Sequence, residues 1–215
     1  MMRAAFIRII AIGIVVAAPF ILWWQWKNQQ SSGSFDIRAA FEGTPVVAPR
    51  LKPVNIYEFD QTWITQNNQR VQLQSFRGKP ALVGFIYTQC PTACSVMTLK
   101  MKEVENWLPA TVRERMHFLS FSIDPERDTP EHLKEYAFRF QSTGSQWQFM
   151  ASEIRQVKEL AKAFSFYFKK EGEFFVHSDM MAVVDQNGTI RQQFWGSPAP
   201  DEIAAAFKKL DEAER

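Results

Sequence analysis

The 215-residue sequence has only two cysteines, Cys90 and Cys94, and this scarcity limits both its covalent architecture and its chemistry. One pair cannot form the disulfide scaffold of a domain this large. Two cysteines so close together more often carry redox chemistry or bind a metal, and a single short structural disulfide is the alternative. The sequence also lacks internal repeats and low-complexity tracts, which argues against a repeat architecture.

An excess of charge of either sign is missing as well. The formal net charge is +2, and Arg3, Arg8 and Lys27 supply three of the positive charges beside an N-terminal apolar stretch. Without those three, residues 28–215 carry a net charge of −1. This balance gives no reason to expect nucleic acid as a partner.

An uncharged run extends from Ile9 to Trp26 and ends in a cluster of tryptophans, the aromatic residues that favour membrane surfaces. A helix of this length spans about 27 Å, close to the roughly 30 Å core of a bilayer. A cleaved signal peptide is the competing interpretation, but the apolar run continues past the poor cleavage site at Ala18. We therefore predict a single-pass anchor over residues 1–27 in a bacterial inner membrane, with the soluble domain in the periplasm.

The polar segment Gln29–Ser34 indicates a flexible linker, and a proline-containing stretch extends the predicted linker over residues 28–54. The folded domain is predicted over residues 55–215, a length that can bury a hydrophobic core. Apolar periodicity then predicts its elements. They are a hairpin within 59–73, strands over 81–87 and 116–123, a helix from Cys94 to Leu108, helices capped by Thr129 and by Ser152 (the latter with Ile154 buried), a hairpin of strands 180–184 and 190–195, and a final helix from Pro200.

Strand–helix–strand–helix followed by a hairpin and a helix indicates an α/β protein with a mixed central sheet and helices on both faces. A cysteine pair at the first strand-to-helix turn best matches the thioredoxin-like fold. We therefore predict this fold, preceded by one N-terminal transmembrane helix.

Cys90 and Cys94 occupy the point where a buried strand meets the N-terminus of a helix. Backbone N–H groups and the helix dipole favour negative charge there, so we expect lowered thiol pKa values and reactive thiolates. Three residues separate the cysteines, whereas thioredoxin-type enzymes have two. The wider spacing permits a disulfide, and it also lets two sulfurs converge on one metal ion.

His177 is the candidate for a third metal ligand. It precedes the strand 180–184, in the loop that packs against the cysteine turn in thioredoxin folds, usually with a cis-proline. No proline occurs between Pro130 and Pro198, so a histidine stands near that place instead. Two thiolates and one imidazole suit copper, with zinc possible in vitro.

Other metal-ligating residue types are predicted to have structural roles. His132 lies on the polar side of a predicted helix and should face solvent, and His117 opens a strand. Met180 and Met181 fall within an apolar strand and are predicted to be core residues rather than axial ligands.

Three motifs in this order resemble the Sco/SenC family, over roughly residues 55–197. They are Gly-Phe-Ile-Tyr-Thr-Gln-Cys-Pro-Thr-Ala-Cys (84–94), Ile-Asp-Pro-Glu-Arg-Asp-Thr-Pro (123–130) with Leu-Lys-Glu-Tyr (133–136), and His177 before Val-Val-Asp-Gln-Asn-Gly (183–188). The resemblance implies that Cys90, Cys94 and His177 bind Cu(I) and Cu(II). It also implies a metallochaperone, rather than an enzyme, that delivers copper to the binuclear site of cytochrome c oxidase. Its partners would be the oxidase subunit with that site and a periplasmic thiol reductant or copper donor.

The sequence departs from the family pattern at three positions. Thr92 and Val176 stand where aspartate is usual, and Ser95 stands where proline is usual. The change at Val176 removes a carboxylate that could orient His177, although Asp179 is close in sequence.

Two other functions use the same cysteines. A thiol–disulfide oxidoreductase that keeps partner cysteines reduced would use Cys90 and Cys94 as its redox-active pair and would not need His177. A peroxiredoxin-like peroxidase is suggested by Cys90-Pro-Thr, but that chemistry expects a threonine three residues earlier, where Tyr87 stands.

Overall fold

The computed structural model describes residues 54–90 and 93–213. The predicted anchor, residues 1–27, and the predicted linker as far as residue 53 lie outside these ranges. Within them, no helix has both the length and the apolar character needed to cross a membrane.

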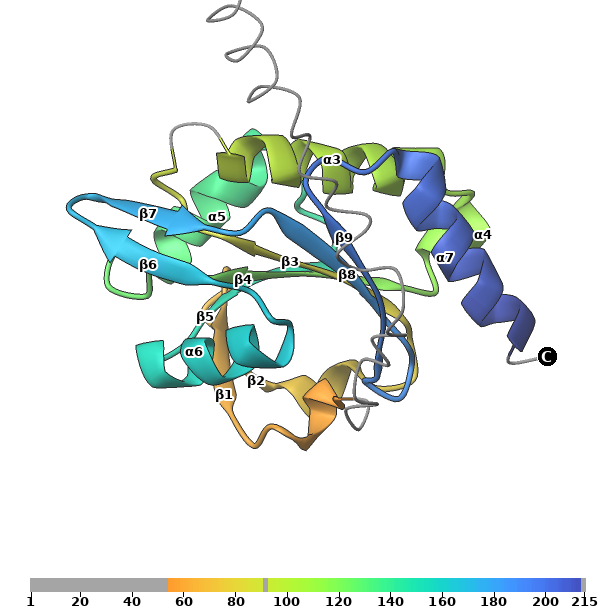
Figure 1. The fold of residues 1–215 in the computed structure, drawn as a ribbon, viewed down its shortest axis with the longest axis horizontal. Helices are drawn as coiled ribbons and strands as arrows, with labels where there is room; N and C mark the ends of the chain where they lie inside the picture. Colours follow the sequence, from red (N-terminus) through yellow and green to blue (C-terminus); the bar gives the residue numbers. More distant parts are fainter. Residues whose placement is uncertain (1–53, 91–92, 214–215) are drawn as a thin grey trace, which may run out of the picture. The chain divides into compact units, whose positions relative to one another are not determined.

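A seven-stranded sheet and a separate two-stranded ribbon make up the β-structure (Figure 1). The strands are β1 (Thr62–Thr65), β2 (Arg70–Gln72), β3 (Ala81–Ile86), β4 (His117–Ser122), β5 (Trp147–Ala151), β6 (Phe168–Glu171), β7 (Phe174–His177), β8 (Met180–Val184) and β9 (Ile190–Trp195). The sheet has the order β2-β1-β5-β4-β3-β8-β9, with β3, β4 and β5 parallel and the other neighbours antiparallel. The ribbon pairs β6 with β7. The predicted mixed sheet is therefore confirmed.

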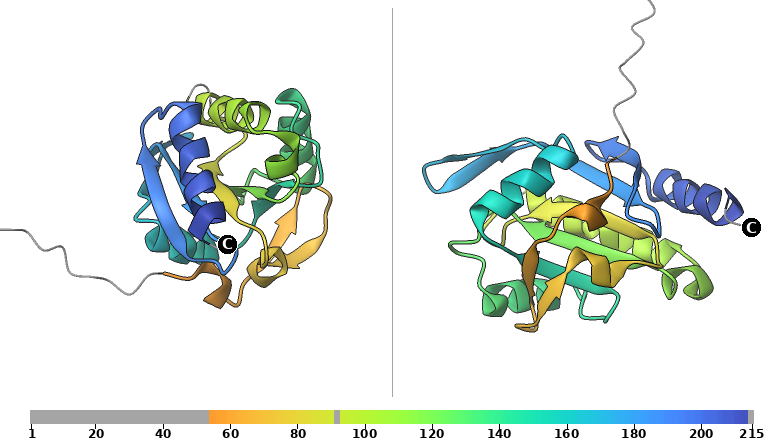
Figure 2. Two further views of the ribbon diagram at one scale, coloured as in Figure 1. Left: turned by 90° about the vertical axis from the view of Figure 1, so that its right-hand side faces the viewer. Right: turned by 90° about the horizontal axis from the view of Figure 1, so that it is seen from below.

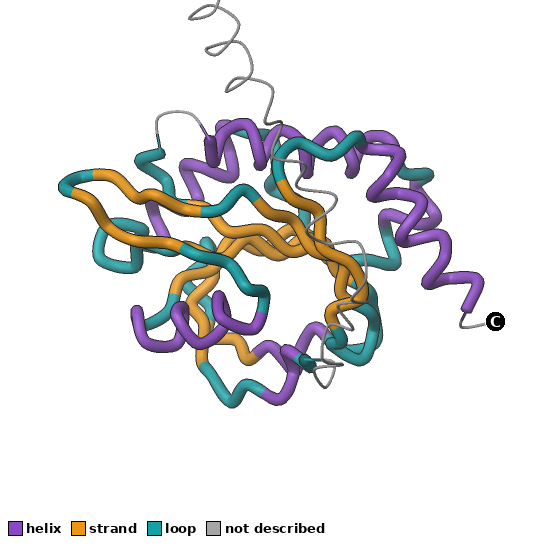
Figure 3. Tube along the Cα trace, viewed as in Figure 1, coloured by secondary structure: helices purple, strands orange, loops and turns teal. Residues whose placement is uncertain are grey.

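Helices cover both faces of this sheet, as predicted. They are the 3-10 turns η1 (Ile56–Glu58) and η2 (Leu73–Phe76) and the α-helices α3 (Ala93–Trp107), α4 (Ala110–Arg113), α5 (Pro130–Arg139), α6 (Ile154–Ala163) and α7 (Pro200–Ala213). Figures 1 and 2 show α3, α5 and α7 on one face and α6 on the other. Figure 3 shows the strands as a layer between these helices.

The central strands β3 and β8 are buried along their whole length, because helices cover both faces of the sheet. Helix α3 lies so close to β3 that a Cβ at Gly84 would stand 2.9 Å from Sδ of Met101. A side chain at Gly84 would therefore force the Met101 side chain to move within the contact between β3 and α3.

Most predicted elements are confirmed, including the cap of α5, where the Thr129 side chain accepts a hydrogen bond from the His132 backbone N–H. The prediction for α6 was wrong in two respects. Its N-cap is Glu153, and Ile154 is 43% exposed. The Ser152 hydroxyl instead donates to the Thr62 carbonyl at 2.7 Å, which ties β5 to β1. Strand β5 and the ribbon were not predicted.

Candidate metal centre

The two cysteines lie where β3 leads toward α3, as the sequence predicts. Cys90 follows the end of β3, and Cys94 is the second residue of α3. The backbone N–H of Cys94 donates to Sγ of Cys90 at 3.2 Å. Neither cysteine is in a disulfide, and both are buried. The local chain path therefore brings the two sulfurs to one place below the surface.

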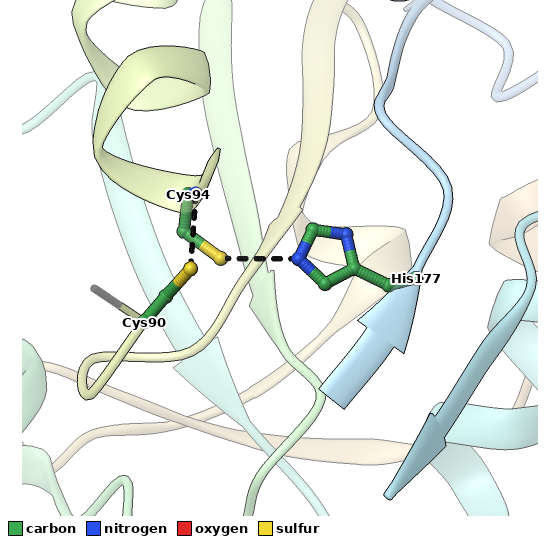
Figure 4. A group of neighbouring side chains, drawn as sticks. All are labelled: Cys90, Cys94 and His177. Carbon is green, nitrogen blue, oxygen red and sulfur yellow. Dashed lines mark hydrogen bonds between the residues drawn. The ribbon is translucent and has the colours of Figure 1, made fainter. Parts of the chain in front are cut away.

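His177 reaches the same place from a distant part of the sequence. Its Nε2 lies 3.7 Å from Sγ of Cys94, and one ligand atom from each of the three residues falls within 4.8 Å of the others (Figure 4). Among the described residues, this is the one group of three or more cysteine, histidine and acidic side chains close enough to share a metal ion. Its composition, two sulfurs and one nitrogen, suits copper.

The position of His177 corrects one detail of the prediction. The residue ends strand β7 and does not lie in a loop before β8. The ribbon turns at Gly172, whose φ of +62° favours glycine. The sequence signal was present, since glycine between two short runs containing phenylalanine is typical of a hairpin.

The imidazole is oriented by the backbone. Its Nδ1 lies 2.9 Å from the carbonyl oxygen of Ser178. A carbonyl only accepts hydrogen bonds, so Nδ1 carries a proton, and in the neutral imidazole Nε2 presents its lone pair toward the sulfurs. This carbonyl takes the orienting role that a carboxylate often has at metal sites.

Asp179, and position 176, where valine stands in place of the usual aspartate, contribute less to the orientation of the imidazole. Oδ1 of Asp179 lies 3.7 Å from Nδ1 of His177, which is too long for a hydrogen bond. Val176 is 53% exposed, because alternate side chains of β7 point to opposite faces of the ribbon. A side chain at position 176 therefore points away from the face that carries His177.

Aromatic rings enclose the histidine. The Tyr87 ring meets the imidazole edge-on at 6.0 Å between centroids, and the Phe166 ring stacks on it at 6.1 Å. The Tyr87 hydroxyl accepts the Phe175 N–H at 3.5 Å and also hydrogen-bonds with Cys90. Burial and then the bond to Cys90 raise the pKa of Tyr87 to about 12, so this hydroxyl keeps its proton at neutral pH. No pattern in the sequence marks Tyr87 as a neighbour of the cysteines and the histidine.

The prediction that the helix start lowers both thiol pKa values is wrong for Cys94. The hydrogen bond with Cys90 and then burial raise the pKa of the Cys94 thiol. These two influences outweigh the backbone contact with Tyr87, which acts in the opposite direction. Cys94 is therefore a protonated thiol at neutral pH until a metal displaces the proton.

A buried carboxylate supports the segment between β3 and Cys90. Asp128 accepts hydrogen bonds from the Thr88 N–H at 3.1 Å, from the Thr88 hydroxyl at 2.6 Å and from the Ser122 hydroxyl at 2.5 Å. Burial raises the pKa of Asp128, and the bonds from Ser122 and Thr88 act against that rise. The motif at residues 123–130 thus contacts Thr88, two residues before Cys90.

The other two histidines do not join the cluster. His132 is exposed, and its Nδ1 lies 2.6 Å from the Arg127 carbonyl oxygen. His117 packs against Phe76 at 5.3 Å between ring centroids. Burial and nearby Lys79 lower the pKa of His117 to about 4. His132 therefore faces solvent, and His117 packs against a neighbouring ring, as predicted.

Comparison with known proteins identifies close likenesses. A sequence model of the family described as SCO1/SenC matches residues 53–212. A protein of Bacillus subtilis named SCO1 protein homolog is 32% identical over 149 residues, which cover 67% of this chain and 76% of that protein.

Two solved structures share the fold. Bradyrhizobium japonicum ScoI with copper bound superposes with a TM-score of 0.60 at 26% identity, over 70% of this chain and 96% of that one. BsSco, described as a member of the Sco family of cytochrome c oxidase assembly proteins with a disulfide switch, gives a TM-score of 0.65 at 29% identity, over 74% and 96% of the two chains. These likenesses confirm the predicted thioredoxin-like fold.

Proposed function

Since the chain belongs to the SCO1/SenC family, we propose that it is a metallochaperone that binds copper through Cys90, Cys94 and His177. Its recipient would be the binuclear copper site of cytochrome c oxidase. The observation that carries the proposal is the convergence of two sulfurs and one imidazole nitrogen within 4.8 Å. Thiolates are soft ligands that hold Cu(I), and the imidazole adds the nitrogen that Cu(II) prefers.

Copper uptake at such a site releases protons. Each thiol that becomes a ligand loses its proton to solvent, and the raised pKa of the Cys94 thiol means that this proton is present before copper arrives. Affinity for copper should therefore increase with pH.

We further propose that residues 1–27 anchor the protein in a bacterial inner membrane. Residues 28–54 form the linker, and residues 55–215 form the copper-binding domain in the periplasm. The polar segment Gln29–Ser34 supports this arrangement, because a flexible tether lets the domain reach a membrane-bound recipient. An oxidising periplasm also calls for a thiol reductant that keeps the cysteines ready for copper, in addition to a copper donor.

Copper titration of the full-length protein in detergent tests the proposal. The reduced protein should bind one equivalent of Cu(I) or of Cu(II), and X-ray absorption should find two sulfur ligands and one nitrogen ligand. Cys90→Ser and Cys94→Ser should each abolish tight binding. Equally tight binding by the protein with a Cys90–Cys94 disulfide would contradict the proposal, because the disulfide occupies the sulfurs.

A thiol–disulfide oxidoreductase is the second candidate. The hydrogen bond from the Cys94 N–H to Sγ of Cys90 favours it, since such a bond stabilises a Cys90 thiolate. Disulfide exchange needs only the cysteines and access to them. This function replaces the first if His177→Ala retains full Cu(II) affinity while Cys90→Ser abolishes a disulfide reductase activity.

A further inference from the structure

The strand that carries His177 is not part of the main sheet. Within residues 54–90 and 93–213, strands β6 and β7 pair only with each other, and the ribbon projects past the sheet on the side where α3 begins (Figure 1). The connection to β8, held by the hydrogen bond from the Gly196 N–H to the Asp179 carbonyl at 2.9 Å, and contacts between the ribbon and the rest of the domain therefore set the distance between His177 and the cysteines. One face of the ribbon packs against the aromatic rings beside the site.

Arg127 makes the most extensive polar connection between the ribbon turn and the cysteine segment. Its Nη2 donates to the Glu173 carbonyl at 2.8 Å, and its Nη1 lies 3.2 Å from the Glu173 carboxylate. The same Nη1 donates to the Gln89 side chain at 3.2 Å, and Gln89 directly precedes Cys90. One guanidinium thus connects the turn before β7 to the residue before Cys90.

Asp124 holds that guanidinium in place. Its carboxylate pairs with Nε of Arg127, and the Asp124 side chain is only 2% exposed. Arginine suits this role because its planar group presents several donors in fixed directions, which a lysine cannot reproduce. The contact is a charge-assisted hydrogen bond at a buried carboxylate, so solvent screens it little.

A second ion pair joins the ribbon to the segment 123–130, which also contains Arg127, and this pair serves as a comparison. Lys170 of β6 lies 2.8 Å from Glu126, but their side chains are 44% and 77% exposed. Ion pairs this exposed contribute little to stability. Lys170 also has no contact with the segment that carries Cys90 among the described interactions.

We propose that Arg127 is a positioning residue of the copper site, which holds the ribbon so that His177 stays within reach of Cys90 and Cys94. This inference rests on the proposed copper function. Arg127→Met should weaken Cu(II) binding about tenfold to a hundredfold, the usual loss when a residue that orients a metal ligand is removed. Cu(I) binding should change less than about threefold, since two thiolates suffice for Cu(I).

The experiment uses the full-length protein in detergent, with Arg127→Met, Arg127→Lys and the matched control Lys170→Met. Cu(II) and Cu(I) affinities are measured by competition, and nitrogen coupling in the electron paramagnetic resonance spectrum reports on His177. Arg127→Lys should resemble Arg127→Met, because the donors of an ammonium all lie on one nitrogen and cannot span the partners that the guanidinium reaches from three nitrogens. Lys170→Met should resemble the wild type.

A double substitution identifies the route of the effect. If Arg127 acts through His177, adding Arg127→Met to His177→Phe should cause no further loss of Cu(II) affinity. Equal losses of Cu(I) and Cu(II) affinity in Arg127→Met would overturn the proposal, because they would place the effect on the cysteines.

Hydrogen exchange of the copper-free protein gives a readout that needs no copper. Arg127→Met should accelerate exchange of the amides in residues 168–177 about tenfold, and Lys170→Met should leave it unchanged. A wild-type protein that fails to bind Cu(II) would refute the proposed copper function. Unchanged ribbon exchange in Arg127→Met would separately overturn the positioning role, whatever the copper result.

Discussion

Replacing His177 separates copper binding from disulfide chemistry most sharply. His177→Phe removes both ring nitrogens but keeps an aromatic ring between Tyr87 and Phe166. His177→Ala removes the ring as well and leaves a cavity in a largely buried place. The two variants together distinguish the loss of a ligand from the loss of packing.

A lower limit to the loss of Cu(II) affinity follows from the contribution that orienting residues make at metal sites. Removal of a residue that merely orients a metal ligand costs about 10-fold to 100-fold in affinity, so loss of the ligand itself should cost at least about 100-fold, or about 2.7 kcal/mol. Cu(I) affinity should fall much less, because Cys90 and Cys94 remain. His177→Ala should also lower the free energy of unfolding by about 2 kcal/mol for the cavity, whereas His177→Phe should lower it less.

Competition titrations with Cu(I) and Cu(II) chelators measure these affinities, and titration with a glutathione buffer measures the Cys90–Cys94 disulfide. The disulfide equilibrium should change little in either variant, since exchange does not involve the imidazole. His117→Ala and His132→Ala are the controls and should bind copper like the wild type. In cells that lack the native gene, the His177 variants should also impair assembly of the copper-containing oxidase. Full Cu(II) affinity in His177→Phe would refute the reasoning.

Three further predictions concern stability and location. The pKa of His117 is lowered from 6.5 to about 4, so the unfolded chain binds the proton first and stability should fall as pH drops from 6.5 toward 4. The loss should be about 1 kcal/mol after allowance for partial exposure, and urea unfolding of His117→Phe should show a weaker pH dependence. Asp128→Ala leaves the donors of Thr88 and Ser122 without their acceptor and should lower the free energy of unfolding by about 2–3 kcal/mol in chemical denaturation; an unchanged midpoint would contradict this. The full-length protein should fractionate with membranes, and a soluble product trimmed after Ala18 would show that the N-terminal segment is cleaved instead.

The elements next to the cysteines could be predicted because their signals are local. A continuous apolar run produces the buried strand β3, and apolar residues at steps of three and four produce α3. The ribbon escaped prediction because β6 and β7 are short and β6 is mostly charged. Strand β5 was not predicted because its apolar run is brief and a predicted helix follows it directly.

Electrostatic properties were harder to predict than positions. A helix start favours a thiolate, and that expectation fails at Cys94 because the neighbouring thiol and burial both favour the protonated form. Neither the direction of the Cys94 side chain nor the approach of Tyr87 is visible in the sequence. The carbonyl of Ser178 orients His177 through the backbone, so no residue type at that position could have indicated it.

The three proposed ligands therefore differ in how the fold holds them. Cys90 and Cys94 are four residues apart, and a backbone hydrogen bond of 3.2 Å joins them directly. His177 comes from a ribbon that pairs with no strand of the main sheet, and both the short connection to β8 and contacts with residues far away in the sequence hold it near Cys94. Changes that loosen the ribbon should weaken the binding of Cu(II), which needs the imidazole, and spare that of Cu(I), which two sulfurs can hold. A partner that draws the ribbon away would consequently leave a two-sulfur site that still holds Cu(I) and has an open position for a thiolate of the recipient.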